Sequence, residues 1–270
     1  MKKVVLITGA SSGMGKETAK LLAQNGYIVY AAARREDKMY DLIPLGVNTI
    51  YMDVTDDHSM VSAVHKIITK EKRIDILVNN AGFGTYGAIE DVSLQQAKYQ
   101  LEVNVFGASR LTQLILPHMR KQKFGKIVNV SSIGGKFATP FGGWYHASKF
   151  ALEALSDSLR NEVKQFGIDV IVIEPGGVKT EWGKIAFESL RKNVENSAYK
   201  ELAIKFANAF TKTLDKNAEP IVIAEIIKKA IETTKPKTRY IGGYMAKAGI
   251  IARNLLSDKM LDRMIMSQAK

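Results

Sequence analysis

The sequence predicts an α/β protein in which a parallel sheet is covered by helices on both faces. Seven short runs rich in Val and Ile recur along the chain, each followed by turn residues and a longer stretch of helical period. Apolar strands that alternate with helices are typical of a parallel sheet buried on both sides. The runs occupy residues 3–8, 27–33, 48–53, 75–79, 126–131, 169–174 and, more weakly, 239–242.

The first unit shows this alternation clearly. Apolar residues at Ala19, Leu22 and Ala23 predict a helix over 15–25, and Gly26 is placed to end it before the second strand. Strand, glycine turn, helix and strand together form one right-handed βαβ unit.

Composition indicates a globular chain and excludes several kinds of chemistry. Of the 270 residues, 46% are hydrophobic and 24% are charged, so we expect one domain over 1–270. The chain has no cysteine, which excludes disulfides, thiolate metal sites and cysteine nucleophiles, and its four histidines are too scattered for a metal site. The apolar run near the N-terminus, only four residues, is too short for a signal peptide or membrane span, so a cytoplasmic location is expected.

The formal net charge of +12 raises the question of nucleic acid or anionic membrane as a partner. Basic residues are interspersed with acids, as in 66–73 and 228–232, and this pattern is typical of solvated helix faces. We therefore expect no nucleic-acid binding. An anionic cofactor or an acidic partner would account for part of the excess charge.

The last part of the chain, 244–268, carries Met, Ile and Leu at helical spacing with Arg and Lys between them. This pattern predicts an amphipathic helix that packs on the core. A lid over an apolar substrate, a dimer contact and a peripheral contact with a membrane surface are the alternatives.

A glycine-rich turn at residues 8–15 follows the first strand and opens the first helix. Backbone N–H groups and the positive end of a helix dipole meet there and bind phosphate without a cationic side chain. The spacing differs from G-x-G-x-x-G, but the strand-turn-helix context is the one that a dinucleotide fingerprint requires. The predicted cofactor-binding residues of this turn are Gly9, Ser11, Ser12, Gly13, Met14 and Gly15.

The same turn also fits the G-x-S-x-G nucleophile elbow of hydrolases. That mechanism needs an acid and then a histidine after the serine, usually late in the chain. The last histidine is His146, and none follows in the remaining 124 residues. The hydrolase interpretation is therefore disfavoured.

The end of the second strand bears on the choice between NAD and NADP. Arg34 and Arg35 stand there, and Lys16 follows the third glycine, so a cation is available for a 2′-phosphate. Glu36 and Asp37 are alternative acceptors for the ribose hydroxyls. The sequence favours NADP and leaves NAD open.

A second group of residues suggests proton transfer. Tyr145 and Lys149 are four residues apart, which places them on one face of a helix, and Ser132 lies thirteen residues before the tyrosine. An ammonium beside a phenol favours deprotonation of the phenol below its usual pKa of about 10. Such a tyrosine can exchange protons near neutral pH. His146 is adjacent but on another helical face, so we expect it to pack or to lie at the surface rather than to take part in catalysis.

The chain resembles the short-chain dehydrogenases/reductases over about residues 3–243. The residues that carry the resemblance are the Thr-Gly-x3-Gly-x-Gly turn, Asn79-Asn80-Ala81-Gly82, Ser132, Tyr145-x3-Lys149 and Pro175-Gly176. Membership of this family implies a Rossmann-like, doubly wound parallel sheet of seven strands in the order 3-2-1-4-5-6-7. It also implies one domain that binds both cofactor and substrate.

The resemblance implies a role for each matching residue. Tyr145 would protonate the carbonyl oxygen in reduction and deprotonate the alcohol in oxidation, and Ser132 would hydrogen-bond that oxygen. Lys149 would lower the tyrosine pKa and hold the nicotinamide ribose, and Asn104 would position a water linking Lys149 to solvent. The other implied cofactor contacts are Asp53 and Val54 at the adenine, Asn79, Ala81 and Gly82 along the adenine side, and Pro175, Gly176, Val178 and Thr180 at the nicotinamide.

The predicted function is an NADP-preferring oxidoreductase for a hydrophobic ketone, aldehyde or secondary alcohol. Apolar and aromatic residues are expected around the substrate, both in a flexible cap over 181–217 and in loops at the carboxyl ends of strands. They are Trp182, Ile185, Phe187, Leu190, Tyr199, Phe206 and Phe210 in the cap and Phe83, Tyr86, Phe137, Phe141 and Trp144 in the loops. The resemblance further implies a homodimer or homotetramer. The alternative function is a dinucleotide-binding sensor or scaffold without catalysis.

Overall fold

The computed structural model describes residues 2–267 and contains one sheet of seven parallel strands in the order β3-β2-β1-β4-β5-β6-β7. The strands are β1 (Val4–Thr8), β2 (Ile28–Ala33), β3 (Asn48–Tyr51), β4 (Ile76–Asn79), β5 (Gly125–Val130), β6 (Ile168–Pro175) and β7 (Arg239–Gly242). The predicted fold class and strand order are confirmed.

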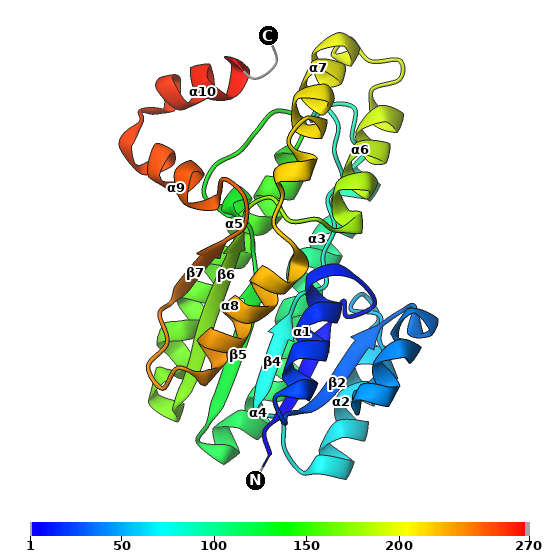
Figure 1. Cartoon of the computed structure of the whole chain (residues 1–270), viewed down its shortest axis with the longest axis vertical. Coiled ribbons are helices and arrows are strands. Elements are labelled where there is room, and N and C mark those ends of the chain that lie inside the picture. The colour runs from blue at the N-terminus through cyan, green and yellow to red at the C-terminus, as the bar shows by residue number, and fades with distance from the viewer. Residues whose placement is uncertain (1, 268–270) are drawn as a thin grey trace.

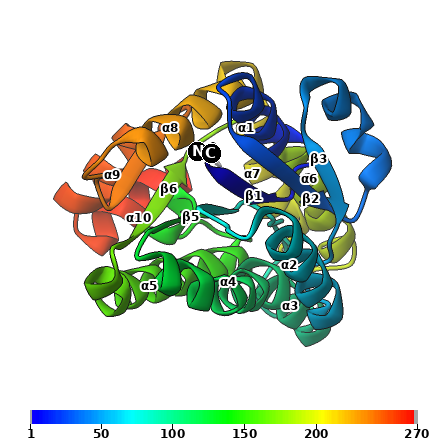
Figure 2. The same ribbon diagram turned by 90° about the horizontal axis from the view of Figure 1, so that it is seen from below.

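Helices cover both faces of the sheet (Figure 2). On one face lie α1 (Gly13–Gln24), η1 (Glu36–Leu45) and α8 (Pro220–Glu232), and on the other lie α2 (Asp57–Glu71), α4 (Ala108–Gln122) and α5 (Gly143–Val163). The remaining elements below the cap are α3 (Leu94–Leu101), the π-helical turn η2 (Glu102–Gly107), and the short η3 (Ile133–Gly135) and η4 (Lys164–Phe166).

Alternation along the strands produces the two cores. In β1, Val5 and Ile7 pack with α1, η1 and α8, whereas Val4 and Leu6 pack with α2 and α4. Successive side chains of a strand point to opposite faces, so a run that is apolar throughout is needed where both faces are covered. Because β1 lies between β2 and β4, the turn that follows it lies inside the carboxyl edge of the sheet and beside the loop that follows β4.

A cap lies beyond the carboxyl ends of the strands (Figure 1) and consists of α6 (Glu181–Asn193), α7 (Lys200–Thr211) and η5 (Leu214–Lys216). It has a small core of its own, in which Leu190, Val194 and Ala203 pack with Phe141 from the loop before α5. The segment predicted to cover the substrate therefore folds as helices over the edge where the strands end.

The C-terminal segment differs from the prediction of one helix over 244–268. Two helices are present, α9 (Ala246–Leu255) and α10 (Asp258–Ser267), and Gln268 lies outside the described residues. Leu256 has extended backbone angles, and the carbonyl of Ser257 accepts from the N–H groups of Met260 and Leu261. Serine and aspartate favour a helix start, so a new helix begins at Ser257-Asp258, where the continuous apolar spacing predicts no break.

None of the helices within residues 2–267 is both long enough and apolar enough to cross a lipid bilayer.

Candidate active site

The glycine turn is built so that side chains are excluded from it. Gly9 and Gly13 have φ of +66° and +53°, a region that glycine adopts without strain. A Cβ on Gly9 would lie 2.8 Å from the Cα of Ala81, and one on Gly15 would lie 2.6 Å from the carbonyl oxygen of Gly9. The backbone is therefore bare at the start of α1, as a phosphate-binding turn requires.

The segment after β4 is fastened to this turn. The hydroxyl of Thr8 accepts hydrogen bonds from the N–H groups of Asn80 and Ala81, at 3.1 and 3.0 Å. The side-chain amide of Asn80 donates to the carbonyl of Thr8 at 3.0 Å. Two loops far apart in the sequence thus form one rigid floor.

A cavity of about 420 Å³ opens over this floor. Most of the predicted cofactor-binding residues line it, namely Gly9, Ser11, Ser12, Gly13, Met14, Arg34, Arg35, Asp53, Val54, Ala81, Gly82 and Thr180. Gly15, Pro175, Gly176 and Val178 do not belong to its lining. The cavity thus brings together residues that follow β1, β2 and β4 with residues at the start of α6.

Asn79, one of the predicted cofactor-binding residues, does not line the cavity. It is 4% exposed, and its amide donates to the side-chain oxygens of Asn129 at 2.9 Å and Thr112 at 3.2 Å. Its side chain belongs to the core between β4, β5 and α4, while the next residue, Asn80, lines the cavity. Adjacent residues at the end of a strand face opposite ways, so the cavity takes the second asparagine.

Two arginines flank the cavity mouth in different ways. Arg34 donates to the phenol oxygen of Tyr99 at 2.8 Å and lies 3.8 Å from a carboxylate oxygen of Asp53. Arg35 reaches back over the turn, where its Nη2 is 3.3 Å from the hydroxyls of Ser11 and Ser12. The same nitrogen donates to the carboxylate of a cap residue, Glu181, at 2.9 Å.

Lys16, the other candidate for the 2′-phosphate, is engaged elsewhere. Its ammonium is 2.8 Å from the carboxylate of Asp41 and 2.8 Å from the carbonyl oxygen of Lys38. Glu36 and Asp37, the alternative ribose acceptors, form the first turn of η1 and do not line the cavity.

Tyr145 and Lys149 lie one helical turn apart on α5 and are both buried. The Lys149 ammonium donates to the carbonyl of Val130 at 2.9 Å and lies 6.0 Å from the centre of the Tyr145 ring. Ser132 follows β5, and its hydroxyl accepts from the N–H of Gly134 at 3.0 Å. The structure thus gathers the three predicted proton-transfer residues at the carboxyl edge of the sheet.

Asn104 joins this group through a π-helical turn between α3 and α4. Its amide nitrogen donates to the carbonyl of Phe83 and to the hydroxyl of Ser148, both at 2.9 Å, and its oxygen accepts from the N–H of Phe83 at 3.0 Å. Asn104 therefore ties the loop after β4 to the helix that carries Tyr145. π-Helical turns within α-helices occur frequently at functional sites.

Burial dominates the electrostatics of the tyrosine-lysine pair. Desolvation raises the pKa of Tyr145 to about 12, although a hydrogen bond with Ser132 lowers it. Desolvation lowers the pKa of Lys149 to about 8, and the charge of Glu153 acts against that shift. The pKa of Tyr145 is therefore raised rather than lowered as expected, because burial of the phenol has the largest effect and the only opposing group is Ser132 rather than Lys149.

Two aromatic rings cause much of this shielding. The ring of Trp182, from the cap, lies 5.1 Å from that of Tyr145, and the ring of Tyr86 lies 5.9 Å from it. Trp182 also lines the cavity, whereas Tyr145, Ser132 and Lys149 do not. The cavity therefore ends at Trp182, and the proton-transfer group lies behind it.

Known proteins resemble this chain in both sequence and structure. A model of the short chain dehydrogenase family matches residues 3–190. The chain belongs to the short-chain dehydrogenase/reductase family. It is accordingly an oxidoreductase that acts on CH–OH or carbonyl groups.

Three individual proteins illustrate the similarity. The 3-ketodihydrosphingosine reductase of Bacteroides thetaiotaomicron is 42% identical over 178 residues, which cover 66% of this chain and 65% of that protein. The NADPH-dependent 3-dehydrocapnine reductase of Ornithobacterium rhinotracheale is 34% identical over 280 residues, 99% of this chain and 98% of that protein. The crystal structure of a short-chain dehydrogenase from Streptomyces avermitilis has a TM-score of 0.79 at 30% identity and covers 94% of this chain and 92% of its own.

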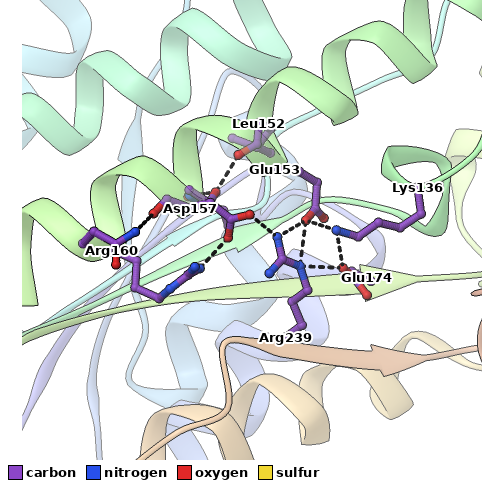
Figure 3. Close-up of polar contacts among 10 residues, drawn as sticks. Lys136, Leu152, Glu153, Asp157, Arg160, Glu174 and Arg239 are labelled. Atoms are coloured by element: carbon purple, nitrogen blue, oxygen red, sulfur yellow. Dashed lines mark hydrogen bonds and ion pairs between the residues drawn. The ribbon is translucent and has the colours of Figure 1, made fainter.

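A partly buried ion network in this dehydrogenase was missed by the sequence analysis (Figure 3). The Arg239 guanidinium lies 2.9 Å from the carboxylate of Glu153, 3.1 Å from that of Glu174 and 2.8 Å from that of Asp157. The ammonium of Lys136 lies 2.7 Å from Glu153 and 3.3 Å from Glu174. The network connects α5, β6, β7 and the loop after β5.

The network fixes the orientation of α5. Glu153 and Asp157 continue the four-residue spacing of Tyr145 and Lys149, so all four lie on one face of the helix. Burial and the neighbouring charge of Glu153 raise the pKa of Glu174, while Lys136 and Arg239 oppose that change. The repeated spacing of Glu153 and Asp157 was the available sequence signal, but their cationic partners come from distant segments.

His146 is buried and packs as predicted. Its Nε2 accepts from the N–H of Thr139 at 3.0 Å, so that nitrogen carries no proton, and its Nδ1 donates to the carbonyl of Gly134 at 2.9 Å. Desolvation lowers the pKa of His146 below 6.5, and the bond to Gly134 opposes this. The neutral ring thus fastens the 134–139 loop beside Tyr145.

Replacing Arg239 by methionine should lower the free energy of unfolding by about 3 kcal/mol, because the buried carboxylates of Glu153 and Glu174 lose one of the two cations that they share. Urea unfolding measures the change. Arg160→Met is the matched control: Arg160 pairs with the half-exposed Asp157 alone, so the loss should stay below about 1 kcal/mol. Adding Glu174→Gln should restore part of the stability of the Arg239 variant. Equal losses in the two arginine variants would contradict a structural role for the network.

Acidification should destabilise the fold through His146. Its folded-state pKa lies below the unfolded value of 6.5, so the unfolded chain binds more protons and stability falls as the pH drops through 6.5. We expect the decrease in Tm between pH 7.5 and pH 5.5 to be smaller in His146→Gln than in the wild type. His65→Gln alters an exposed histidine and should keep the wild-type decrease. Parallel curves for wild type and His146→Gln would refute this assignment.

Proposed function

We propose that this enzyme is an NADPH-preferring reductase of hydrophobic ketones or aldehydes that also runs in reverse on the secondary alcohol. The observation that supports the proposal is the placement of Arg34 and Arg35 on the cavity above the glycine turn, with Tyr145 in contact with Trp182 of the cavity wall. The NADPH dependence named for the Ornithobacterium relative and the keto group named for the Bacteroides relative support it.

The residues present fit a dinucleotide. Gly9, Gly13 and Gly15 leave the backbone bare at the start of α1, where the diphosphate would be held. Arg35 would bind the 2′-phosphate together with Ser11 and Ser12, because its guanidinium already lies over both hydroxyls. The bound nicotinamide supplies the hydride.

The chain supplies orientation and a proton. During reduction Tyr145 donates its phenolic proton to the carbonyl oxygen, and Ser132 donates a hydrogen bond to the same oxygen. The positive charge of Lys149 stabilises the phenolate that this transfer creates. Asn104, through Phe83 and Ser148, holds the surrounding loop and helix at fixed separation. In oxidation the same groups act in the opposite order.

An apolar substrate is supported by the rings that surround this group. Tyr86 and Trp182 lie against Tyr145, and Phe141 packs edge-on against Phe206 of the cap at 5.7 Å. Other predicted pocket residues have different neighbours: Phe83 lies 5.6 Å from Tyr99 near the adenosine cavity, and Phe137 faces Gly249 of α9. The substrate contacts that we propose are therefore Tyr86, Phe141 and Trp182.

We also propose that the enzyme self-associates through α4 and α5, which lie side by side (Figure 2). Phe150 and Leu155 on α5 are 45% and 47% exposed, and Phe106, which lies in η2 just before α4, is 56% exposed. Large apolar residues concentrated on adjoining helices are suited to an isologous dimer contact.

Replacing Tyr145 by phenylalanine should lower kcat by about 10²- to 10⁴-fold while NADPH still binds, because only the proton donor is lost. NADPH oxidation with a panel of ketones and aldehydes measures turnover, and calorimetry measures cofactor binding. Tyr40→Phe removes an exposed hydroxyl and should be without effect. Undiminished turnover in Tyr145→Phe would refute the mechanism, and no turnover by the wild type on any carbonyl would favour the sensor function.

Replacing Arg35 by glutamine should raise the KM for NADPH about 10- to 100-fold and the KM for NADH less than 3-fold, because a charge-assisted bond to phosphate is lost. Arg34→Gln should act in the same direction. Lys16→Gln is the matched control, since Lys16 is paired with Asp41, and it should change neither KM more than 2-fold. Equal effects of Arg35→Gln on both cofactors would show that Arg35 does not bind the 2′-phosphate.

A further inference from the structure

We propose that Glu181 is a specificity-determining residue that makes access to Tyr145 depend on the 2′-phosphate of the cofactor. The proposal rests on the proposed function, because it takes Arg35 as the phosphate ligand. Glu181 and its neighbour Trp182 begin α6, and they contact the two halves of the site. Glu181 contacts Arg35 at the cofactor cavity, and Trp182 covers Tyr145.

The first contact is a charge pair across the mouth of the cavity. Arg35 donates to the carboxylate of Glu181 at 2.9 Å, and both side chains are about half exposed, at 49% and 54%. The pKa of Glu181 is lowered, first by this hydrogen bond. An exposed pair of this kind is weak. It holds the cap in place but yields to a stronger competitor.

The second contact blocks the inner end of the cavity. The indole of Trp182 lies 5.1 Å from the ring of Tyr145 and 5.7 Å from that of Tyr86. A Cβ on Gly84 would lie 2.8 Å from this indole, so the ring rests directly on the backbone after β4. A carbonyl substrate reaches the phenol only when Trp182 moves away.

The geometry of α6 confines such a movement to its first turn. Farther along the helix, the hydroxyl of Ser189 accepts from the N–H of Tyr86 at 3.1 Å, and the amide of Asn193 donates to the carbonyl of Tyr86 at 2.8 Å. These bonds anchor the rest of α6 to the floor of the site. Gly183 follows Trp182, and a Cβ built on it has no neighbour closer than 3.9 Å. Its backbone freedom and surrounding space allow the first turn to bend.

The 2′-phosphate competes directly with Glu181. A doubly charged phosphate binds a guanidinium more strongly than an exposed carboxylate does, and it repels a carboxylate held at the same nitrogen. Binding of NADPH at Arg35 therefore expels Glu181, and Trp182 moves with it because the two residues are consecutive. NADH has no group that displaces Glu181, so Tyr145 stays covered. The 2′-phosphate thus promotes turnover as well as binding.

Fluorescence of Trp182 tests this coupling without turnover. The chain has two tryptophans, so Trp144→Phe leaves Trp182 as the sole reporter. Adenosine 2′,5′-bisphosphate should shift its emission to longer wavelength and raise acrylamide quenching at least 2-fold. Adenosine 5′-monophosphate, which lacks only the 2′-phosphate, should do neither at saturation. If Trp144→Phe does not fold, the difference between wild type and Trp182→Phe isolates the same signal.

Variants of α6 complete the test. Glu181→Gln should show the shifted emission without ligand, bind the bisphosphate at least 3-fold more tightly, and lose most of the difference in kcat between NADPH and NADH. Glu188→Gln makes the same charge change on an exposed residue that faces Lys184, and it should behave as the wild type does. Unchanged emission in Glu181→Gln would overturn the proposal.

Calorimetry distinguishes a failure of the proposed coupling from a failure of the proposed NADPH preference. If the bisphosphate binds more tightly than the monophosphate but leaves Trp182 emission unchanged, the coupling is wrong and the NADPH preference stands. If the two ligands bind equally, the NADPH preference itself fails, and the coupling fails with it.

Discussion

The face of α5 that carries Tyr145, Lys149, Glu153 and Asp157 is the constraint on which the rest of the site depends. Tyr145, Lys149 and Glu153 are buried on this face and Asp157 is half-exposed, and buried polar groups are stable only when partners satisfy them. Arg239 supplies that compensation from β7, more than eighty residues later in the chain. The last strand of the sheet is thus required to hold the helix that presents the phenol, which explains why a weak four-residue strand matters to the site.

Local patterns were sufficient to predict the sheet and the glycine turn. Apolar runs, the turn spacing and the position of Arg34 and Arg35 are properties of short segments, and the family resemblance supplied the strand order. Features that depend on which way a side chain faces were not predictable in this way. Asn80 rather than Asn79 lines the cavity because of the direction in which each side chain points at the end of β4. The spacing of apolar and charged residues likewise does not indicate that Arg239 will pair with Glu174. Nor does it indicate that the backbone at Leu256 will be extended and end α9.

The pKa values of Tyr145 and Lys149 also could not be predicted from the sequence. An i, i+4 spacing indicates that an ammonium lies near a phenol, but it does not indicate how much water remains. Trp182 and Tyr86 exclude that water, and the pKa of Tyr145 rises to about 12 while that of Lys149 falls to about 8. Since desolvation penalises both charged forms, the pair is unsuited to proton transfer while the cap covers it. In the proposed mechanism the same residues become effective when Trp182 moves away.

Covering the phenol has a chemical advantage that connects the cap with the cofactor. A site that stays open would expose the proton donor to solvent and to carbonyls before the hydride source is in place. In this fold the start of α6 packs on the glycine turn. The evidence is that a Cβ built on Gly13 would lie only 2.9 Å from the side chain of Thr180, the residue that precedes α6. The segment that covers Tyr145 is therefore also the segment that contacts the phosphate site, and no longer pathway between the two is needed. If Trp182 moves as we propose, this shared segment requires the cofactor to bind before the substrate.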